Sequence, residues 1–196
     1  MQITDNLKND ISNAPSWFHD AISIKPNEKI LEDVKGKLSY SVWPSSSKNK
    51  NLMIFIHGTG AHKKWWYPIA PQFASYSNVI AVDLPGMGDS GFREKYSIKD
   101  FGECIISIIE KEKSDMDIDN ISIIGHSLGG QVAGYVASEK KDLVSNLIMI
   151  DTFIRPPDWD PSESEGGPLR MIKHYPDKTT ILKRFRLLPQ QDCNND

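Results

Sequence analysis

The sequence predicts an α/β fold with a mostly parallel sheet and helices on both faces. Apolar runs of strand length recur along the chain, and turn residues follow each of them, at 52–60, 78–88, 120–130 and 146–152. Continuous rather than alternating apolar runs are typical of strands buried on both faces, as in a parallel sheet covered by helices. Helical patterns lie between these runs, and an alternation of strands and helices favours a parallel sheet.

The elements before and after the first runs follow from local patterns. Residues 26–44 alternate in parts around a lone Gly36, which favours two short antiparallel strands. A helical pattern over 97–113 places its apolar residues on one face. Ser97 and Asp100 are spaced as in a capping box, which predicts that this helix begins there.

Two further helical patterns are expected. Residues 127–141 are rich in Gly and Ala on one side, which permits close packing of a helix against the sheet. The pattern over 63–76 contains two prolines, so a helix there must hold them in or before its first turn. Beyond residue 154 a loop precedes one or two short helical patterns, and no strand is predicted.

Composition excludes several functional classes. The chain has 196 residues, a net charge of −3 and no basic block, which argues against nucleic-acid binding. Its longest apolar runs are far too short for a membrane span, and its polar, acidic start predicts no signal peptide. Cys104 and Cys193 form no metal or redox spacing. We therefore expect a cytoplasmic protein without metal or cofactor, and no oligomeric state is indicated.

The stretch Gly125–Gly129 matches the pattern G-x-S-x-G around Ser127. An apolar strand precedes it and a helix of small residues follows, which is the context of a nucleophile elbow. Its glycines permit a turn so tight that the serine hydroxyl projects above the sheet edge, at a helix N-terminus. A serine needs an adjacent base to act as a nucleophile.

A second glycine-rich turn, His57–Gly60, follows an earlier strand. Acyl transfer needs backbone N–H groups directed at the developing oxyanion. One such group is expected from Leu128, directly after the serine, and the other from Thr59, with Gly60 as the next choice.

Gly86–Gly91 matches the dinucleotide fingerprint G-x-G-x-x-G, which would indicate a nucleotide-binding oxidoreductase. In that fingerprint the glycines open a helix at once. Here the helical pattern begins only near Ser97, and Pro85 also shapes the turn. The context therefore argues against dinucleotide binding.

These motifs together resemble the α/β-hydrolase family over about residues 27 to 152, in "HGTG", "DLPGMGDSG" and "GHSLGG". The resemblance implies the fold and a Ser–acid–His triad, in that chain order. A serine at the elbow argues against the dehalogenase and epoxide hydrolase branches, which use a carboxylate nucleophile. The family spans many substrates, so the fold does not identify this one.

The resemblance also suggests a substrate pocket. The stretch after the oxyanion loop looks like a subgroup with a His and paired Trp residues. The residues expected at the pocket are His57, Gly58, Gly60, Trp65 and Trp66, with Trp159 from a cap. Their type favours a small apolar or aromatic ester as the substrate.

The general base is the missing member of this set. The chain has five histidines, His19, His57, His62, His126 and His174. Only His174 follows the serine, in a stretch where the family inserts cap helices. The side chain of His126 is expected to point away from the hydroxyl into the structure. Asp151, at the end of the fourth run, is a candidate for the triad acid or for a loop cap.

We therefore expect an incomplete α/β-hydrolase, with the core in residues 1–154 and a partial cap in 155–196. The family core needs two further strands and a histidine after them, and their absence would leave a sheet edge and its apolar face exposed. The predicted function is a serine hydrolase that acts on a small-molecule ester through an acyl-enzyme, with Ser127 and Asp151 catalytic. The alternative is a binding protein of the same fold that lacks the base.

Overall fold

The computed structural model describes residues 14–33, 36–47, 49–154, 176–177 and 180 of the chain. Residues 17–154 form one compact unit. The helices and strands are α1 (Ser16–Ser23), β1 (Asn27–Asp33), β2 (Gly36–Trp43), β3 (Asn51–Ile56), η2 (Lys63–Trp66), η3 (Ala70–Phe73), β4 (Asn78–Val82), α2 (Ile98–Asp115), β5 (Asn120–His126), α3 (Leu128–Glu139) and β6 (Val144–Ile150). Nearly all of the expected cap, including Trp159 and His174, lies outside the described residues.

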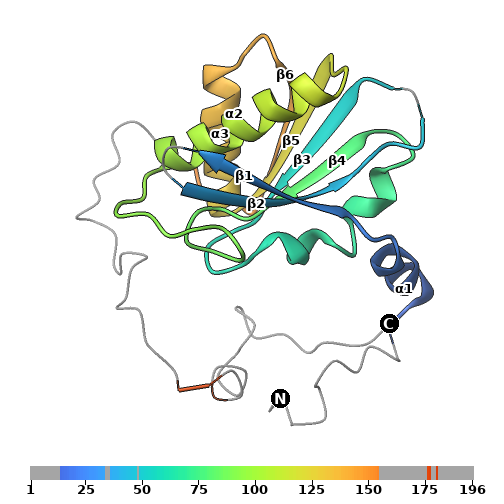
Figure 1. The fold of residues 1–196 in the computed structure, drawn as a ribbon, viewed down its shortest axis with the longest axis horizontal. Coiled ribbons are helices and arrows are strands. Elements are labelled where there is room, and N and C mark those ends of the chain that lie inside the picture. The colour runs from blue at the N-terminus through green and yellow to red at the C-terminus, as the bar shows by residue number, and fades with distance from the viewer. Residues whose placement is uncertain (1–13, 34–35, 48, 155–175, 178–179, 181–196) are drawn as a thin grey trace. The chain divides into compact units, whose positions relative to one another are not determined.

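The six strands form one sheet in the order β1-β2-β4-β3-β5-β6 (Figure 1). β1 and β2 are antiparallel and meet at Gly36, as the sequence predicts. β2 also pairs antiparallel with β4, whereas β4, β3, β5 and β6 are mutually parallel neighbours. The predicted α/β fold with a mostly parallel sheet is confirmed, and the carboxyl ends of four parallel strands lie side by side.

Both faces of the sheet are covered because its central strands are apolar on both sides. Ile54 and Ile56 of β3 face the core that α2 and α3 complete, and Phe55 between them faces a second core. Trp66 of η2 and Ala70 of η3 close this second core. In Figure 1 the two long helices lie on one side of the sheet and the short η helices on the other. Each fully buried isoleucine contributes about 2 kcal/mol of transfer free energy.

Helix α2 begins where its cap predicts. The Ser97 side chain accepts a hydrogen bond from the Asp100 amide at 3.0 Å, and the buried face carries residues such as Ile105 and Ile108. Two local expectations are corrected. Residues 63–76 form two 3₁₀ turns instead of a helix, because their prolines remove amide donors. Helix α1 has no counterpart in the sequence prediction.

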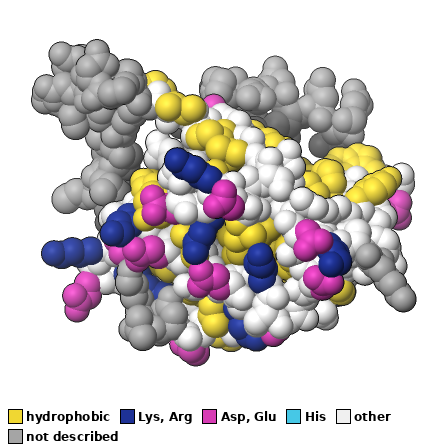
Figure 2. Space-filling model, turned by 90° about the horizontal axis from the view of Figure 1, so that it is seen from above, with side chains coloured by type: hydrophobic (Ala, Val, Ile, Leu, Met, Phe, Trp, Pro, Cys, Tyr) yellow, Lys and Arg dark blue, Asp and Glu magenta, His cyan; other side chains and the backbone are white. Residues whose placement is uncertain are grey.

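The surface of the described unit carries two further features. Acidic and basic side chains are interspersed over the face seen in Figure 2. β6 forms an edge of the sheet, and its Leu147, Ile148 and Ile150 side chains are exposed. Among the described helices, none is both long and apolar enough to cross a membrane.

Candidate active site

Ser127 alone forms the turn between β5, which ends at His126, and α3, which begins at Leu128. Its backbone has φ 51° and ψ −116°, a conformation that is strained for a residue with a side chain. The Ser127 amide donates to the Ile150 carbonyl at 2.9 Å, which ties the turn to the end of β6. This single-residue turn between strand and helix is the geometry of a nucleophile elbow.

Glycines allow the elbow to pack closely. A Cβ atom at Gly125 would lie 2.2 Å from the Gly129 carbonyl oxygen, and one at Gly129 would lie 2.3 Å from the Ile56 carbonyl oxygen. Both distances are far below van der Waals contact. The first turn of α3 can therefore lie directly against the carboxyl ends of β5 and β3 only because these positions lack side chains.

The segment His57–His62, which we call the oxyanion loop after the role that the sequence predicts for it, lies against the elbow. A Cβ atom at Gly58 would lie 3.2 Å from the Ser127 Cβ. The loop turns over Thr59 and Gly60, with Gly60 at φ +72° and both residues exposed. No described residue accepts a hydrogen bond from the Thr59 or Gly60 amide. The Leu128 amide opens α3, where N–H groups have no partner within the helix.

His57 is fully buried and serves the loop structurally. Its Nε2 accepts a hydrogen bond from the Leu84 amide at 3.1 Å, so the proton is on Nδ1, which lies 2.8 Å from the Gly58 carbonyl oxygen. Burial lowers the pKa of the His57 imidazole, which favours the neutral ring. With both nitrogens bonded to backbone, this ring cannot accept the Ser127 proton, and it offers no surface to a substrate.

His126 lies between two of the predicted site residues. Its ring stacks on the Trp65 indole at a centroid distance of 5.3 Å, and its Nε2 is 3.9 Å from the Asp151 carboxylate. The His126 side chain is 24% exposed, and its Nδ1 is buried beside Gly58. Asp151 follows β6 with φ 47° and an exposed side chain. Trp65 is also exposed, and so is available beside the elbow.

Comparison with known proteins agrees with this geometry. A family model described as the alpha/beta hydrolase fold matches residues 51–174. The chain belongs to the α/β-hydrolase fold family. It is 31% identical over 140 residues to a pimeloyl-[acyl-carrier protein] methyl ester esterase of Pseudoalteromonas atlantica, a match that covers 67% of this chain and 50% of that protein.

Other matches among α/β hydrolases differ in the reaction for which they are named. A soluble epoxide hydrolase of a Corynebacterium species is 33% identical over 50% of this chain and 34% of its own length. The thioesterase domain of the curacin biosynthetic pathway superposes with a TM-score of 0.57 at 26% identity, over 65% of this chain and 46% of that domain. The chain thus spans about half the length, or less, of these relatives.

The structure does not gather every predicted site residue of this α/β hydrolase at the elbow. Trp66 is 4% exposed and packs against Phe55 in the second core, so it offers almost no surface to a substrate. Among the described histidines, none forms a hydrogen bond with the Ser127 hydroxyl. His62 is exposed at the end of the oxyanion loop.

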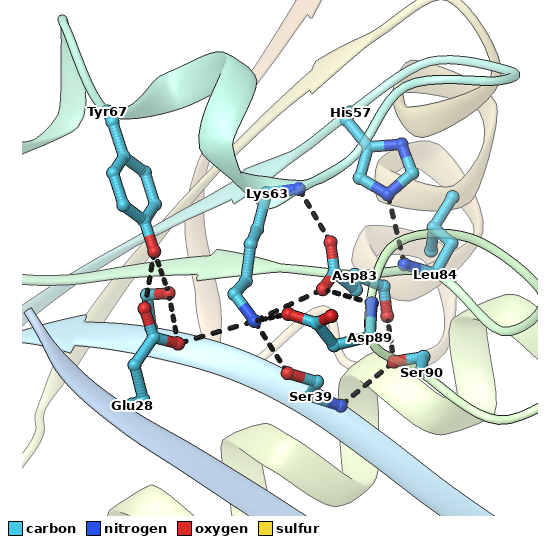
Figure 3. A network of polar contacts seen from close by, with 10 residues as sticks. Glu28, Ser39, His57, Lys63, Tyr67, Asp83, Leu84, Asp89 and Ser90 are labelled. Carbon is cyan, nitrogen blue, oxygen red and sulfur yellow. Dashed lines mark hydrogen bonds and ion pairs between the residues drawn. The ribbon is translucent and has the colours of Figure 1, made fainter. Parts of the chain in front are cut away.

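Sequence reasoning missed a charged cluster beside the oxyanion loop of this α/β hydrolase (Figure 3). Lys63 is 2% exposed, and its ammonium lies among the carboxylates of Glu28, Asp83 and Asp89. A lysine in a polar stretch usually indicates solvent exposure. The signal that could have indicated otherwise is the aspartate Asp83, which directly follows a buried strand and itself needs a buried partner.

Proposed function

We propose that Ser127 is the nucleophile of a hydrolase that cleaves a small ester-like carbonyl compound through an acyl-enzyme. The observation that carries the proposal is the positive φ of Ser127 in a one-residue turn, with Gly58 packed directly against it. Two of the matched proteins are named as an esterase and a thioesterase, which supports an acyl substrate. A serine at the elbow fits acyl transfer better than epoxide opening by a carboxylate.

The proposed reaction begins when the Ser127 Oγ attacks the substrate carbonyl and its proton passes to a base. The amides of Thr59 and Leu128 would donate hydrogen bonds to the oxyanion, reinforced by the partial positive charge at the N-terminus of α3. Loss of one such donor typically costs about 100- to 1000-fold in rate. Collapse of the intermediate releases the alcohol, which takes up the proton, and water then frees the acyl group.

The general base comes, in this proposal, from a histidine outside the described residues. His57 is excluded because both of its nitrogens bond to backbone groups. Asp151, at the end of β6, or a later acid would orient that histidine. The alternative function, a binding protein with an unactivated serine, is favoured by one observation. No described histidine reaches the Ser127 hydroxyl by a hydrogen bond.

The substrate is proposed to rest against Trp65, the exposed indole beside the elbow. A flat apolar wall suits a small apolar or aromatic acyl group. We assign the core of the enzyme to residues 1–154 and a partial cap to 155–196. The cytoplasm is the proposed location, since it keeps thiols such as the buried Cys104 reduced.

A serine-reactive fluorophosphonate tests the nucleophile. The full chain should form a covalent adduct on the peptide that contains Ser127, detected by mass spectrometry, and a Ser127→Ala variant should form none. Turnover of a p-nitrophenyl ester separates the two functions, because an elbow and oxyanion hole without their base retain only residual reactivity. Labelling without turnover supports the binding protein. A wild-type chain that is not labelled contradicts the role of Ser127.

A further inference from the structure

A buried cation lies immediately after the oxyanion loop. Lys63 is the first residue of η2, and its side chain is 2% exposed. Its Nζ lies 2.6 Å from the Ser39 hydroxyl, 3.1 Å from Asp89, 3.2 Å from Asp83 and 3.3 Å from Glu28. Figure 3 shows these groups converging on the ammonium from β1, β2 and the segment after β4. One lysine thus joins the β1–β2 hairpin to the segment after β4, which is far from that hairpin in the sequence.

The Asp83 carboxylate links two loops. Its Oδ1 accepts a hydrogen bond from the Lys63 backbone amide at 2.6 Å, and its Oδ2 accepts one from the Asp89 amide at 2.9 Å. The next residue, Leu84, donates its amide to the His57 ring at the other end of the oxyanion loop. The loop is therefore fastened at both ends to two consecutive residues that follow β4.

The charge of Lys63 is what allows this carboxylate to stay buried. Burial lowers the pKa of the Lys63 ammonium, but attraction to Asp83 and the hydrogen bonds to Asp89 and Asp83 outweigh it and leave that pKa raised. The hydrogen bond and charge of Lys63 also lower the pKa of Asp89. Without the ammonium, the Asp83 carboxylate, whose side chain is 1% exposed, would lose this ion pair and stay near the carboxylates of Glu28 and Asp89.

We propose that Lys63 is a positioning residue for the oxyanion hole. Its ammonium holds the Asp83 carboxylate in the orientation that fastens the C-terminal end of the oxyanion loop, and so fixes the position of the Thr59 amide. This role rests on the proposed function, since it matters for chemistry only if Ser127 reacts. Donors to an oxyanion act within a narrow range of distance, so a small displacement of the loop suffices to slow the reaction.

The test compares Lys63→Met with a matched control, Lys29→Met, in the full chain. Lys29 also pairs with a buried carboxylate, that of Glu112 at 2.9 Å, but it lies on β1, and among the described residues no hydrogen bond or ion pair joins it to the loop. Amide hydrogen exchange by mass spectrometry follows the two hydrogen-bonded amides at this end of the loop, those of Ala61, which donates to the Gly58 carbonyl, and of residue 63, which donates to Asp83. We expect exchange there to accelerate about tenfold or more in Lys63→Met, because the loop opens locally, and to stay unchanged in Lys29→Met.

The second readout is the rate of fluorophosphonate labelling of Ser127. The labelling rate should fall about 10- to 100-fold in Lys63→Met, because the Thr59 amide is displaced but not removed, and removal of a donor costs about 100- to 1000-fold. In Lys29→Met the rate should stay within about twofold of the wild-type rate. A purely structural role would lower the thermal stability of both variants without this difference in rate. If Lys63→Met does not fold, Asp83→Asn, which has nearly the same shape, removes the charge through which Lys63 acts and should open the loop likewise.

Two results would overturn the proposal. The first is an amide exchange rate of the loop that equals the wild-type rate in folded Lys63→Met, or in Asp83→Asn if Lys63→Met does not fold. The second is equal acceleration in Lys29→Met. If the wild-type chain does not react with the phosphonate, the proposed hydrolase function fails, but the exchange measurement still decides whether Lys63 holds the loop.

Discussion

Replacing Gly129 with alanine tests how closely helix α3 packs against strand β3. The new Cβ would lie 2.3 Å from the Ile56 carbonyl oxygen and 2.6 Å from the His57 carbonyl oxygen. Both are backbone atoms, so no side chain can rotate away and the helix itself must shift. Overpacking of this kind costs up to about 3 kcal/mol. Alanine returns about 1 kcal/mol through its higher helix propensity, so we expect a net loss of up to about 2 kcal/mol.

Gly134 on the same helix provides the matched control. A Cβ there would contact only the Met149 Cε, at an ordinary distance of 3.7 Å. Gly134→Ala should therefore raise the free energy of unfolding by about 0.5 to 1 kcal/mol. Urea unfolding followed by circular dichroism measures both variants against the wild type. Equal stability of the two variants would refute the close packing of Gly129, since helix propensity affects both alike.

Three further predictions concern stability. Glu112→Ala removes a fully buried carboxylate that accepts a hydrogen bond from Lys29 at 2.9 Å, and should cost about 3 kcal/mol in urea unfolding. Glu110, whose carboxylate is exposed, is the control, and Glu110→Ala should cost less than about 1 kcal/mol. Similar losses of stability in the two variants would contradict the idea that burial makes the Glu112 pair matter. Burial, with a hydrogen bond to a carboxylate, raises the pKa of Tyr67 from 10.0 to about 12. Because the pKa of Tyr67 is higher in the folded state, its neutral hydroxyl stabilises the fold below pH 10, and this contribution is lost as the pH rises from 10 to about 12. Urea unfolding at several pH values should therefore show that Tyr67→Phe loses less stability than the wild type between pH 10 and 12. Equal losses in the two proteins would contradict the raised pKa. Ser97→Ala removes the cap of α2 and should cost about 1 kcal/mol, whereas an unchanged urea midpoint would show that the cap contributes nothing.

Most of the sheet could be predicted because its signals are local. The continuous apolar runs of β3 and β5 are explained by burial on both faces, and Gly36 marks the turn of the β1–β2 pair. Ser97 marks the start of α2 in the same way, because a cap is made by residues three apart. The turn at Ser127 follows from the glycines around it.

The environments of neighbouring polar and aromatic side chains could not be predicted. Trp65 and Trp66 are adjacent in the sequence, yet one stacks on His126 at the surface and the other fills the second core. Which of them faces outward depends on the 3₁₀ geometry of η2, which no periodic pattern indicates. The burial of Lys63 depends on partners such as Glu28, which only the folded sheet brings to it.

The described core also shows why two parts of the proposed chemistry can be tested separately. The first part is the placement of Ser127 and the oxyanion loop, and the second is proton transfer by a general base. Ser127 and the oxyanion loop are fastened by backbone and buried polar bonds within residues 17–154, through Ile150 on one side and Asp83 on the other. Nothing in that fastening requires a general base. A chain with Ser127 and the oxyanion loop alone should therefore react slowly and covalently with electrophiles that mimic an acyl substrate. Efficient turnover requires a histidine as the general base as well. Amide exchange of the loop in Lys63→Met consequently reports on the placement of the oxyanion loop whether or not a general base is present.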